Sequence, residues 1–182
     1  MRPHAPTPSS PFVLHYTVRS CVWGLALVAA TERGIAAVLL GDDRSALIDD
    51  LQRRFARAQL DTGGALLHRW SDAVLATLAH PGAAPSQPVP LDMHGTAFQQ
   101  QVWQALRSIP PGQTRSYRQV AQALGQPLAV RAVASACAAN PLAVLVPCHR
   151  VLRSDGGWGG YRWGLQRKQQ LLAHEARVAP AG

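Results

Sequence analysis

A cysteine, a histidine and an arginine follow one another at positions 148–150, inside the apolar stretch Val144–Leu152. A cysteine is nucleophilic as the thiolate, and a nearby base or positive charge favours that form. If this stretch is an extended chain, the neighbouring side chains of Cys148 and His149 point to opposite faces, so a bridging water could link them. The alternative interpretation is a buried structural cysteine beside a hydrogen-bonded histidine.

The other two cysteines, Cys21 and Cys137, do not extend this site into a disulfide framework or a metal centre. Three cysteines are too few for such a framework, and no Cys or His residues have zinc-ligand spacing. We therefore expect no metal ion and no cofactor. Free cysteines favour a reducing compartment, and we expect a cytoplasmic protein. The sequence has neither a secretory signal nor an apolar run of about 18 residues, so we expect no membrane contact.

The net charge of +8 comes from 18 Lys and Arg residues against 10 Asp and Glu residues, in a chain of 182 residues that is 47% hydrophobic. This length and composition predict a globular protein of one domain or two small ones. Residues 92–182 hold ten basic and three acidic side chains, which gives +7. A half this basic favours an anionic partner, with nucleic acid as the first candidate. A basic surface that only improves solubility is the alternative.

Strands followed by helices are predicted for the first half of the chain. Residues 1–11 contain four prolines and are expected to form a disordered tail. Strands are predicted over residues 14–23, 25–30 and 35–40 from their β-formers and apolar runs. Helices are predicted up to residue 57, with Asp43 or Ser45 as the cap, and over residues 66–79. Four prolines within residues 80–90 then mark a stiff linker and a domain boundary.

The second half has the outline of a helix-turn-helix. Thr96 is expected to cap a helix over 97–108, and Ser116 a short helix over 117–124 with Gly125 at its end. A second, Ala-rich helix is expected over 128–139. A recognition helix in the major groove needs long polar side chains, and this helix offers Arg131 alone among small residues. A tightly packed helix pair with no DNA role remains the alternative.

Short motifs recur in order through this half, and they carry a family resemblance. The motifs are Phe98–Trp103, Ile109–Gly112, Ser116–Tyr117, Ala129–Val133, Asn140–Pro141, Pro147–Val151, Gly160–Tyr161 and Leu171–Glu175. With them, the chain resembles the O6-alkylguanine-DNA alkyltransferases, also called methylated-DNA–protein-cysteine methyltransferases, over residues 14–178. Residues 38–43 and 95–103 look especially like the C-terminal part of the bacterial adaptive-response proteins. The resemblance supports base repair and gives no support for metal-triggered control of transcription.

The resemblance implies an α/β fold with an N-terminal ribonuclease H-like domain, followed by a mostly helical domain with a winged-helix-like helix-turn-helix. On this basis we divide the chain into a tail (1–13), an α/β domain (14–80), a linker (81–94), a DNA-binding alkyltransferase domain (95–178) and a tail (179–182). The implied partner is double-stranded DNA, bound through the minor groove independently of sequence, where small residues allow close approach. We expect a monomer, and cooperativity on DNA is left open.

The implied function is DNA repair in a single turnover. The protein flips O6-alkylguanine, chiefly O6-methylguanine and also O4-methylthymine, out of the duplex and transfers the alkyl group irreversibly to Cys148. His149 takes the thiol proton through a water, and Glu175 orients the imidazole. Tyr117 donates a hydrogen bond to guanine N3, and Asn140 is a hinge that holds the reactive segment.

Further residues are implied to contact the DNA or the flipped base. Arg131 fills the vacated place in the base stack, and Ser116 contacts the DNA beside Tyr117. The carbonyls of Cys148 and Val151 accept from the guanine amino group, and a backbone N–H near Arg162 faces O6. Arg162 and Trp163 stand where some relatives have small residues, and Trp163 is expected to restrict the alkyl pocket. Cys137 is expected to pack near the pocket without accepting the alkyl group.

Two other functions stay open from the sequence. A cysteine hydrolase could use Cys148, His149 and Glu175, but it would need an oxyanion hole, and no Gly-rich nucleophile elbow is present. A lesion-sensing module could bind damaged DNA without repairing it, but such relatives lack the cysteine. Turnover of esters or peptides would favour the first alternative, and intact mass after mixing with a methylated oligonucleotide distinguishes both from alkyl transfer.

Overall fold

A four-stranded sheet forms the first part of the fold in the computed structural model, which describes residues 12–83 and 87–178. The strands are β1 (Phe12–Cys21), β2 (Gly24–Ala30), β3 (Ile35–Gly41) and β4 (Ala58–Thr62), in the order β3-β2-β1-β4. β1, β2 and β3 form antiparallel pairs, whereas β4 runs parallel to β1. The three predicted strands are confirmed in type, and β4 was not predicted.

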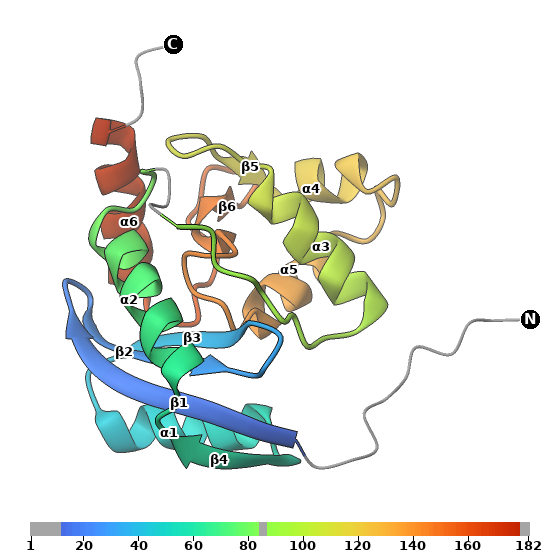
Figure 1. Cartoon of the computed structure of the whole chain (residues 1–182). Helices are drawn as coiled ribbons and strands as arrows, with labels where there is room; N and C mark the ends of the chain where they lie inside the picture. The colour runs from blue at the N-terminus through green and yellow to red at the C-terminus, as the bar shows by residue number, and fades with distance from the viewer. Residues whose placement is uncertain (1–11, 84–86, 179–182) are drawn as a thin grey trace, which may run out of the picture.

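Two helices pack on this sheet, α1 (Arg44–Arg54) and α2 (Ala65–Ala79), with α1 below the sheet and α2 above it in Figure 1. The predicted cap of α1 is confirmed, because the Asp43 side chain accepts from the Ala46 backbone N–H at 2.7 Å. α1 ends earlier than predicted, since the chain turns at Phe55 into the unpredicted strand β4. Phe12 and Val13, predicted as the end of the tail, instead begin β1, and the rest of both predicted tails lies outside the described residues.

The second part contains α3 (Ala97–Arg107), α4 (Tyr117–Ala123), α5 (Val130–Ala139) and α6 (Leu165–Val178). Two short parallel strands, β5 (Arg115–Ser116) and β6 (Val151–Leu152), pair with each other. They join the start of α4 to the chain that follows Cys148–Arg150. Thr96 and Ser116 cap α3 and α4 as predicted, and each takes part in a capping box with a glutamine three residues later. Gly125, at φ +70°, occupies the left-handed conformation that the turn from α4 to α5 requires.

One hydrophobic core runs through both parts of the molecule. It joins sheet residues such as Leu27 and Val38 to Trp103 of α3 and Leu171 of α6, all of them 1% exposed or less. The chain of the predicted linker is attached to the sheet, because the Ile35 N–H donates to the Pro90 carbonyl at 2.8 Å. The division into domains on either side of residues 81–94 stays a prediction. No helix in residues 12–83 or 87–178 is both long and apolar enough to cross a membrane.

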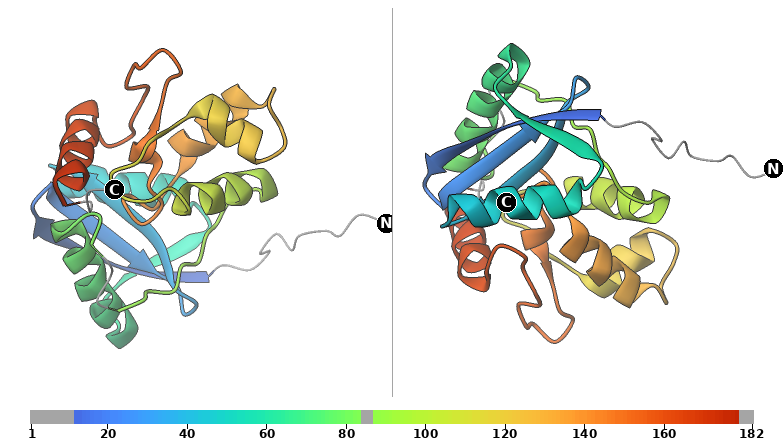
Figure 2. Two further views of the ribbon diagram at one scale, coloured as in Figure 1. Left: turned by 90° about the horizontal axis from the view of Figure 1, so that it is seen from above. Right: turned by 90° about the horizontal axis from the view of Figure 1, so that it is seen from below.

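Strand β3 also positions the segment that leads to the reactive cysteine. The Val38 N–H donates to the Pro141 carbonyl at 2.8 Å, and the Ala143 N–H donates to the Val38 carbonyl at 2.9 Å. The chain therefore leaves α5 along the edge of the sheet and reaches Cys148 within a few residues. The views in Figure 2 show this central segment, in orange, between the sheet and the helices of the second part.

Candidate active site

Cys148 begins a single 3-10 turn, Cys148–Arg150, and is 5% exposed. The chain is therefore not extended at this point: the Arg150 N–H donates to the Pro147 carbonyl at 3.0 Å and closes the turn. The turn directs Cys148 toward the pocket described below and His149 into the interior, where it has no exposed surface. All three side chains of the turn are buried, so the turn lies inside the protein and not on its surface.

Asn140, fully buried at the end of α5, holds the reactive segment with its side chain. Its Nδ2 donates to the Val146 carbonyl at 2.9 Å and to the Cys148 Sγ at 3.2 Å, and its Oδ1 accepts from the Leu142 N–H at 2.8 Å. One amide group thus uses both its donors and its acceptor on the loop that carries the nucleophile. This geometry is what the predicted hinge role of Asn140 requires.

His149 and Arg150 both contact Glu175 of α6 inside the protein. His149 Nε2 lies 2.8 Å from Glu175 Oε1. Arg150 donates to the same carboxylate through Nε at 2.9 Å and Nη2 at 2.7 Å. Arg150 also donates through Nη1 to the Ile109 carbonyl at the end of α3. Glu175 therefore balances the charge of Arg150 and orients His149, and Arg150 fixes the turn between α3 and α6.

The charge state of this triad determines which nitrogen of His149 can act as a base. Burial alone would raise the pKa of Glu175, but hydrogen bonds from His149 and Arg150 outweigh it and hold that pKa at about 2. An ionised carboxylate only accepts, so His149 Nε2 carries the proton and donates it to Glu175. The Nδ1 atom is then the unprotonated one, and it has no hydrogen-bond partner among the described residues. Burial lowers the pKa of His149, which keeps the ring neutral.

The Cys148 sulfur is a thiol in the resting protein. Burial raises its pKa to about 11, although the Asn140 hydrogen bond and the charge of Lys168 act in the opposite direction. A thiol with this pKa needs a base at the moment of reaction, because the thiolate is the nucleophilic form. The neutral Nδ1 of His149, the next residue of the same turn, is a candidate for this base.

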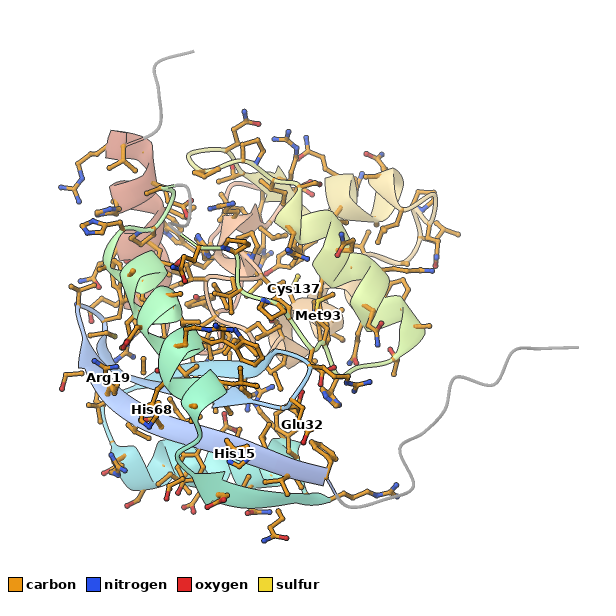
Figure 3. All side chains as sticks on the ribbon, in the orientation of Figure 1. His15, Arg19, Glu32, His68, Met93 and Cys137 are labelled. Carbon is orange, nitrogen blue, oxygen red and sulfur yellow. The ribbon has the colours of Figure 1, made fainter. Side chains whose placement is uncertain are left out.

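A cavity of about 330 Å³ opens beside Cys148. It is lined by Tyr117 of α4, by Ala134, Cys137 and Ala138 of α5, by Cys148, and by the loop residues Gly160, Tyr161 and Arg162. Cys137, labelled in Figure 3, is one of the lining residues, so a second thiol shares this cavity. Burial raises the pKa of Cys137 strongly, which makes it a poorer nucleophile than Cys148.

Tyr117 faces this cavity from the first turn of α4, and the loop approaches its ring closely. A Cβ atom at Gly159 would lie 2.8 Å from the Tyr117 hydroxyl, and Gly159 has φ +65°, so glycine is required there. Burial raises the pKa of Tyr117 to about 12. The phenol therefore stays protonated near neutral pH and can donate a hydrogen bond into the cavity.

Lys168 is a buried residue of this site that the sequence analysis missed. Its Nζ donates to the carbonyls of Val151, Trp158 and Gly160, at 2.7, 2.5 and 3.3 Å, and the side chain has no exposed surface. A single lysine among 17 arginines, on the same face of α6 as Glu175, was the signal that could have revealed it. The Val151 carbonyl, expected to accept from a guanine, thus already accepts from Lys168 and keeps a second lone pair.

The other predicted site residues divide into those in the cavity wall and those outside it. Arg162 lines the cavity, and its Nη2 pairs with Asp50 of α1 at 2.6 Å. Trp163 is 5% exposed and packs edge-to-face on Tyr161, with 5.3 Å between ring centroids, so it lies behind the lining residues. Arg131 is exposed in the first turn of α5, and Ser116 caps α4 next to Tyr117.

The donor atoms of this site do not form a metal centre. In the parts of the chain that the structure describes, no group of three or more His, Cys, Asp or Glu residues could hold a metal ion. The arrangement is instead that of a thiol and a protonated phenol in the wall of one cavity, with an oriented histidine buried behind the thiol. Such a set can transfer a group from a bound molecule to sulfur.

Comparisons with known proteins agree on one family. Residues 97–177 match the family model described as 6-O-methylguanine DNA methyltransferase, DNA binding domain. The chain is 53% identical over 163 residues to the Escherichia coli bifunctional transcriptional activator/DNA repair enzyme Ada, covering 90% of this chain and 46% of that protein. It is 52% identical over 93 residues to a methylated-DNA–protein-cysteine methyltransferase of Mycolicibacterium paratuberculosis, covering 51% and 56%. The chain thus spans about half the length of these relatives.

Solved structures resemble nearly the whole chain. The crystal structure of the Mycobacterium tuberculosis O6-methylguanine methyltransferase has a TM-score of 0.73 and 34% identity, covering 93% of this chain and 97% of that one. The structure of the Mycobacterium tuberculosis OGT in complex with DNA has a TM-score of 0.70 and 34% identity, covering 92% and 96%. The mixed α/β architecture of sheet and helices is therefore shared across both halves of the chain.

Proposed function

The chain belongs to the O6-methylguanine DNA methyltransferase family, and we propose that it moves a methyl group from O6 of guanine in DNA to its own Cys148. The observation that carries the proposal is the hydrogen-bond chain around the cysteine. Asn140 holds the Cys148 sulfur, and Glu175 presents His149 with its Nδ1 as the free base. The family resemblance of the sequence and this geometry both support Cys148 as the acceptor of the methyl group.

In the proposed reaction, the Cys148 sulfur attacks the methyl carbon in line with the bond to O6. The S–C bond forms as the C–O bond breaks, and His149 Nδ1 takes the thiol proton through a bridging water. The electron pair of the broken bond goes to the guanine, where the Tyr117 hydroxyl donates a hydrogen bond to N3. The Cys148 and Val151 carbonyls accept from the guanine amino group, and a backbone N–H near Arg162 faces O6.

The product is a thioether, and each molecule therefore acts once. No residue in the cavity offers a route to hydrolyse an S–alkyl bond, so the protein is consumed by its reaction. The same chemistry would act on the methyl group of O4-methylthymine, which we propose as a second lesion. The proposed step needs neither a metal ion nor a cofactor.

The proposed partner is double-stranded DNA, entered from the minor groove by α5. The small residues of this helix allow close approach, and the +7 charge of residues 92–182 favours phosphate contacts that are independent of sequence. The target base must leave the stack to reach the buried sulfur, and exposed Arg131 would fill the vacated place. Ser116 would contact the DNA beside Tyr117. We propose a monomer that works in the cytoplasm.

The finer description of the fold is also a proposal. Three antiparallel strands with a fourth strand parallel to β1 support a ribonuclease H-like first domain, residues 14–80. The helices α3, α4 and α5, with the small β5–β6 sheet, support a winged-helix-like second domain, residues 95–178. The resemblance of the whole chain to one solved family structure is consistent with both.

Intact mass spectrometry tests the proposed function directly. The purified chain is mixed with a duplex oligonucleotide that carries one O6-methylguanine, and an unmethylated duplex is the control. We expect each protein molecule to gain one methyl group, and peptide mapping to place it on Cys148 and not on Cys21 or Cys137. Unchanged protein mass would contradict alkyl transfer. Continued turnover of an ester or peptide would instead support the cysteine hydrolase.

A further inference from the structure

The cavity beside Cys148 has two walls that come from separate segments of the chain. One wall is the last part of α5, with Ala134, Cys137 and Ala138. The facing wall is the loop Gly160–Arg162 between β6 and α6. Lys168 holds the base of this loop through the Gly160 carbonyl, but Arg162 lies beyond the carbonyls that Lys168 contacts. Tyr161 packs on His149 and Trp163. The Arg162 side chain adds a contact that joins the loop to the sheet-containing part of the molecule.

Asp50 of α1, in the sheet-containing part of the molecule, makes that contact with both walls. Its Oδ1 accepts from Arg162 Nη2 at 2.6 Å, across 112 positions of sequence. Its Oδ2 accepts from Arg54 Nε at 3.2 Å, and Arg54 Nη1 donates to the Ala139 carbonyl at 3.1 Å. Ala139 is the last residue of α5 and directly precedes Asn140, which holds the Cys148 sulfur.

The Asp50 end of these contacts is mostly buried, whereas the Arg162 end reaches the surface. The side chains of Asp50 and Arg54 are 17% and 13% exposed, and that of Arg162 is 36% exposed. Exposed ion pairs contribute little, but removing one partner from a buried group leaves an uncompensated charge behind. Without the Asp50 carboxylate, Arg53, Arg54 and Arg162 would lose their shared counter-charge, and Arg162 would be free to leave the loop position that lines the cavity.

We propose that Asp50 is a positioning residue of the alkyl-transfer pocket, which fixes the loop Gly160–Arg162 against the end of α5 through Arg162 and Arg54. The inference rests on the proposed function, since the pocket is the one that would receive the flipped base. It gives the sheet-containing part of the chain a role in the reaction itself. Two guanidinium groups, each on a different oxygen of the Asp50 carboxylate, suit this role, because the planar groups hold a fixed direction.

Single-turnover kinetics with the full chain separate positioning from mere stability. A suicide reaction gives two numbers: the amplitude reports the fraction of folded, competent protein, and the rate constant at saturating DNA reports the pocket of each competent molecule. A purely structural role of Asp50 would lower the amplitude and leave the rate constant unchanged. A positioning role lowers the rate constant.

The experiment measures methyl transfer from duplex DNA that carries one O6-methylguanine. It compares wild type with the single variants Asp50→Asn, Arg54→Ala and Arg162→Ala. It also compares the double variant Arg54→Ala/Arg162→Ala with the triple variant that adds Asp50→Asn to it. We expect Asp50→Asn to lower the rate constant about tenfold, and each arginine variant less. In the chain without both arginines, Asp50→Asn should change the rate constant less than about twofold, because the one remaining partner is the exposed Arg53 at 3.5 Å, which touches neither wall of the cavity. Asp72→Asn, which breaks the exposed pair with Arg19, is the matched control and should react like wild type.

A second readout uses no DNA. With iodoacetamide, the Asp50→Asn protein should alkylate Cys148 faster than wild type while Cys21 reacts at an unchanged rate, which excludes general unfolding. The inference is overturned if Asp50→Asn transfers methyl at the wild-type rate constant, or slows the chain without both arginines as much as it slows wild type. Absence of transfer by wild type itself would overturn the proposed function, and the iodoacetamide comparison would still report whether Asp50 shapes the pocket.

Discussion

The His149 ring and the Glu175 carboxylate meet at 2.8 Å, and both side chains are fully buried. The same carboxylate receives two hydrogen bonds from Arg150, so the buried negative charge is balanced by a permanent cation and oriented toward a histidine. Two roles follow for Glu175, one in the free energy of unfolding and one in the proton transfer from Cys148. They can be measured separately.

Glu175 should make the stability of the protein depend on acid pH. Its pKa in the folded protein is about 2, against 4.5 for the ordinary group. A carboxyl group with a depressed pKa stabilises the fold above its unfolded pKa, and that contribution, about 3 kcal/mol here, is lost as the pH falls from about 5 toward 2. Urea unfolding at a series of pH values from 6 to about 2 measures it. Glu175→Gln should lower the free energy of unfolding at pH 6, and that free energy should then fall less steeply between pH 6 and about 2 than in wild type. If it falls as steeply as in wild type, other groups cause the acid sensitivity.

The rate of methyl transfer should follow the protonation of His149. Burial lowers its pKa below the ordinary 6.5, so the ring is a neutral base at pH 7 and stays one into mildly acidic solution. We expect the single-turnover rate constant to be flat from pH 8 down to about 6.5 and to fall only at more acidic pH. A quenched-flow series with methylated duplex measures this profile. If the rate constant already falls between pH 8 and 7, with a midpoint above the ordinary histidine pKa of 6.5, neutral His149 is not the base.

Lys168→Met should loosen the loop that borders the cavity. The lysine ammonium satisfies the carbonyls of Val151, Trp158 and Gly160, and methionine of similar length leaves all three without that donor. Because a buried carbonyl without a partner is costly, we expect unfolding to require about 2 kcal/mol less free energy. We also expect slower methyl transfer. Urea unfolding and single-turnover rates measure the two effects, and Arg177→Met at the exposed end of α6 is the control.

Local patterns predicted the parts of the fold that depend on neighbouring residues. The caps Asp43, Thr96 and Ser116 each bind a backbone N–H three residues away, and all three could be predicted from the sequence. Strand β4 was missed, because the apolar and polar alternation of Ala58–Thr62 is only five residues long with Ala58 and Leu60 as its apolar residues, and its parallel pairing with β1 is a contact between distant segments.

Contacts between distant segments limited the prediction of the site. The motif around Cys148 predicted a nucleophile and a base side by side, but it did not predict the 3-10 turn or the hydrogen bonds that Asn140 makes across the loop. The Asp50–Arg162 pair joins residues 112 positions apart and leaves no local pattern in the sequence. Lys168 could have been noticed by its helical spacing with Glu175, whereas its three carbonyl partners could not.

Arg131 should matter for opening the duplex and not for the chemistry. It is exposed at the start of α5 and is not among the residues that line the cavity. Arg131→Ala should slow repair of methylated duplex DNA by tenfold or more, on the order of the free energy that base unstacking requires, and leave the reaction with free O6-methylguanine nearly unchanged. The comparison uses the same protein preparations with both substrates, and Arg118→Ala on α4 serves as a charge-matched control. Equal losses on the two substrates would place Arg131 in the transfer step.

Trp163 should limit the size of the alkyl group, and the structure places it one layer behind the cavity. Its indole packs edge-to-face on Tyr161, and Tyr161 is one of the lining residues. A methyl group fits without moving this pair, but a benzyl group would need Tyr161 to shift against a buried ring. Overpacking of this kind costs about 1–3 kcal/mol, which corresponds to roughly a 5- to 150-fold slower reaction.

The variant Trp163→Gly gives Tyr161 room to move and should speed the reaction with free O6-benzylguanine relative to wild type, while methyl transfer from DNA changes less. Trp163→Phe keeps an aromatic ring behind Tyr161 and should stay slow with the benzyl substrate. Loss of the indole also removes buried area, so the rate constants are compared for the reacting fraction only. A wild type that is already fast with O6-benzylguanine, or a glycine variant that is no faster, would show that the Tyr161–Trp163 contact leaves enough room and that Trp163 serves the core alone.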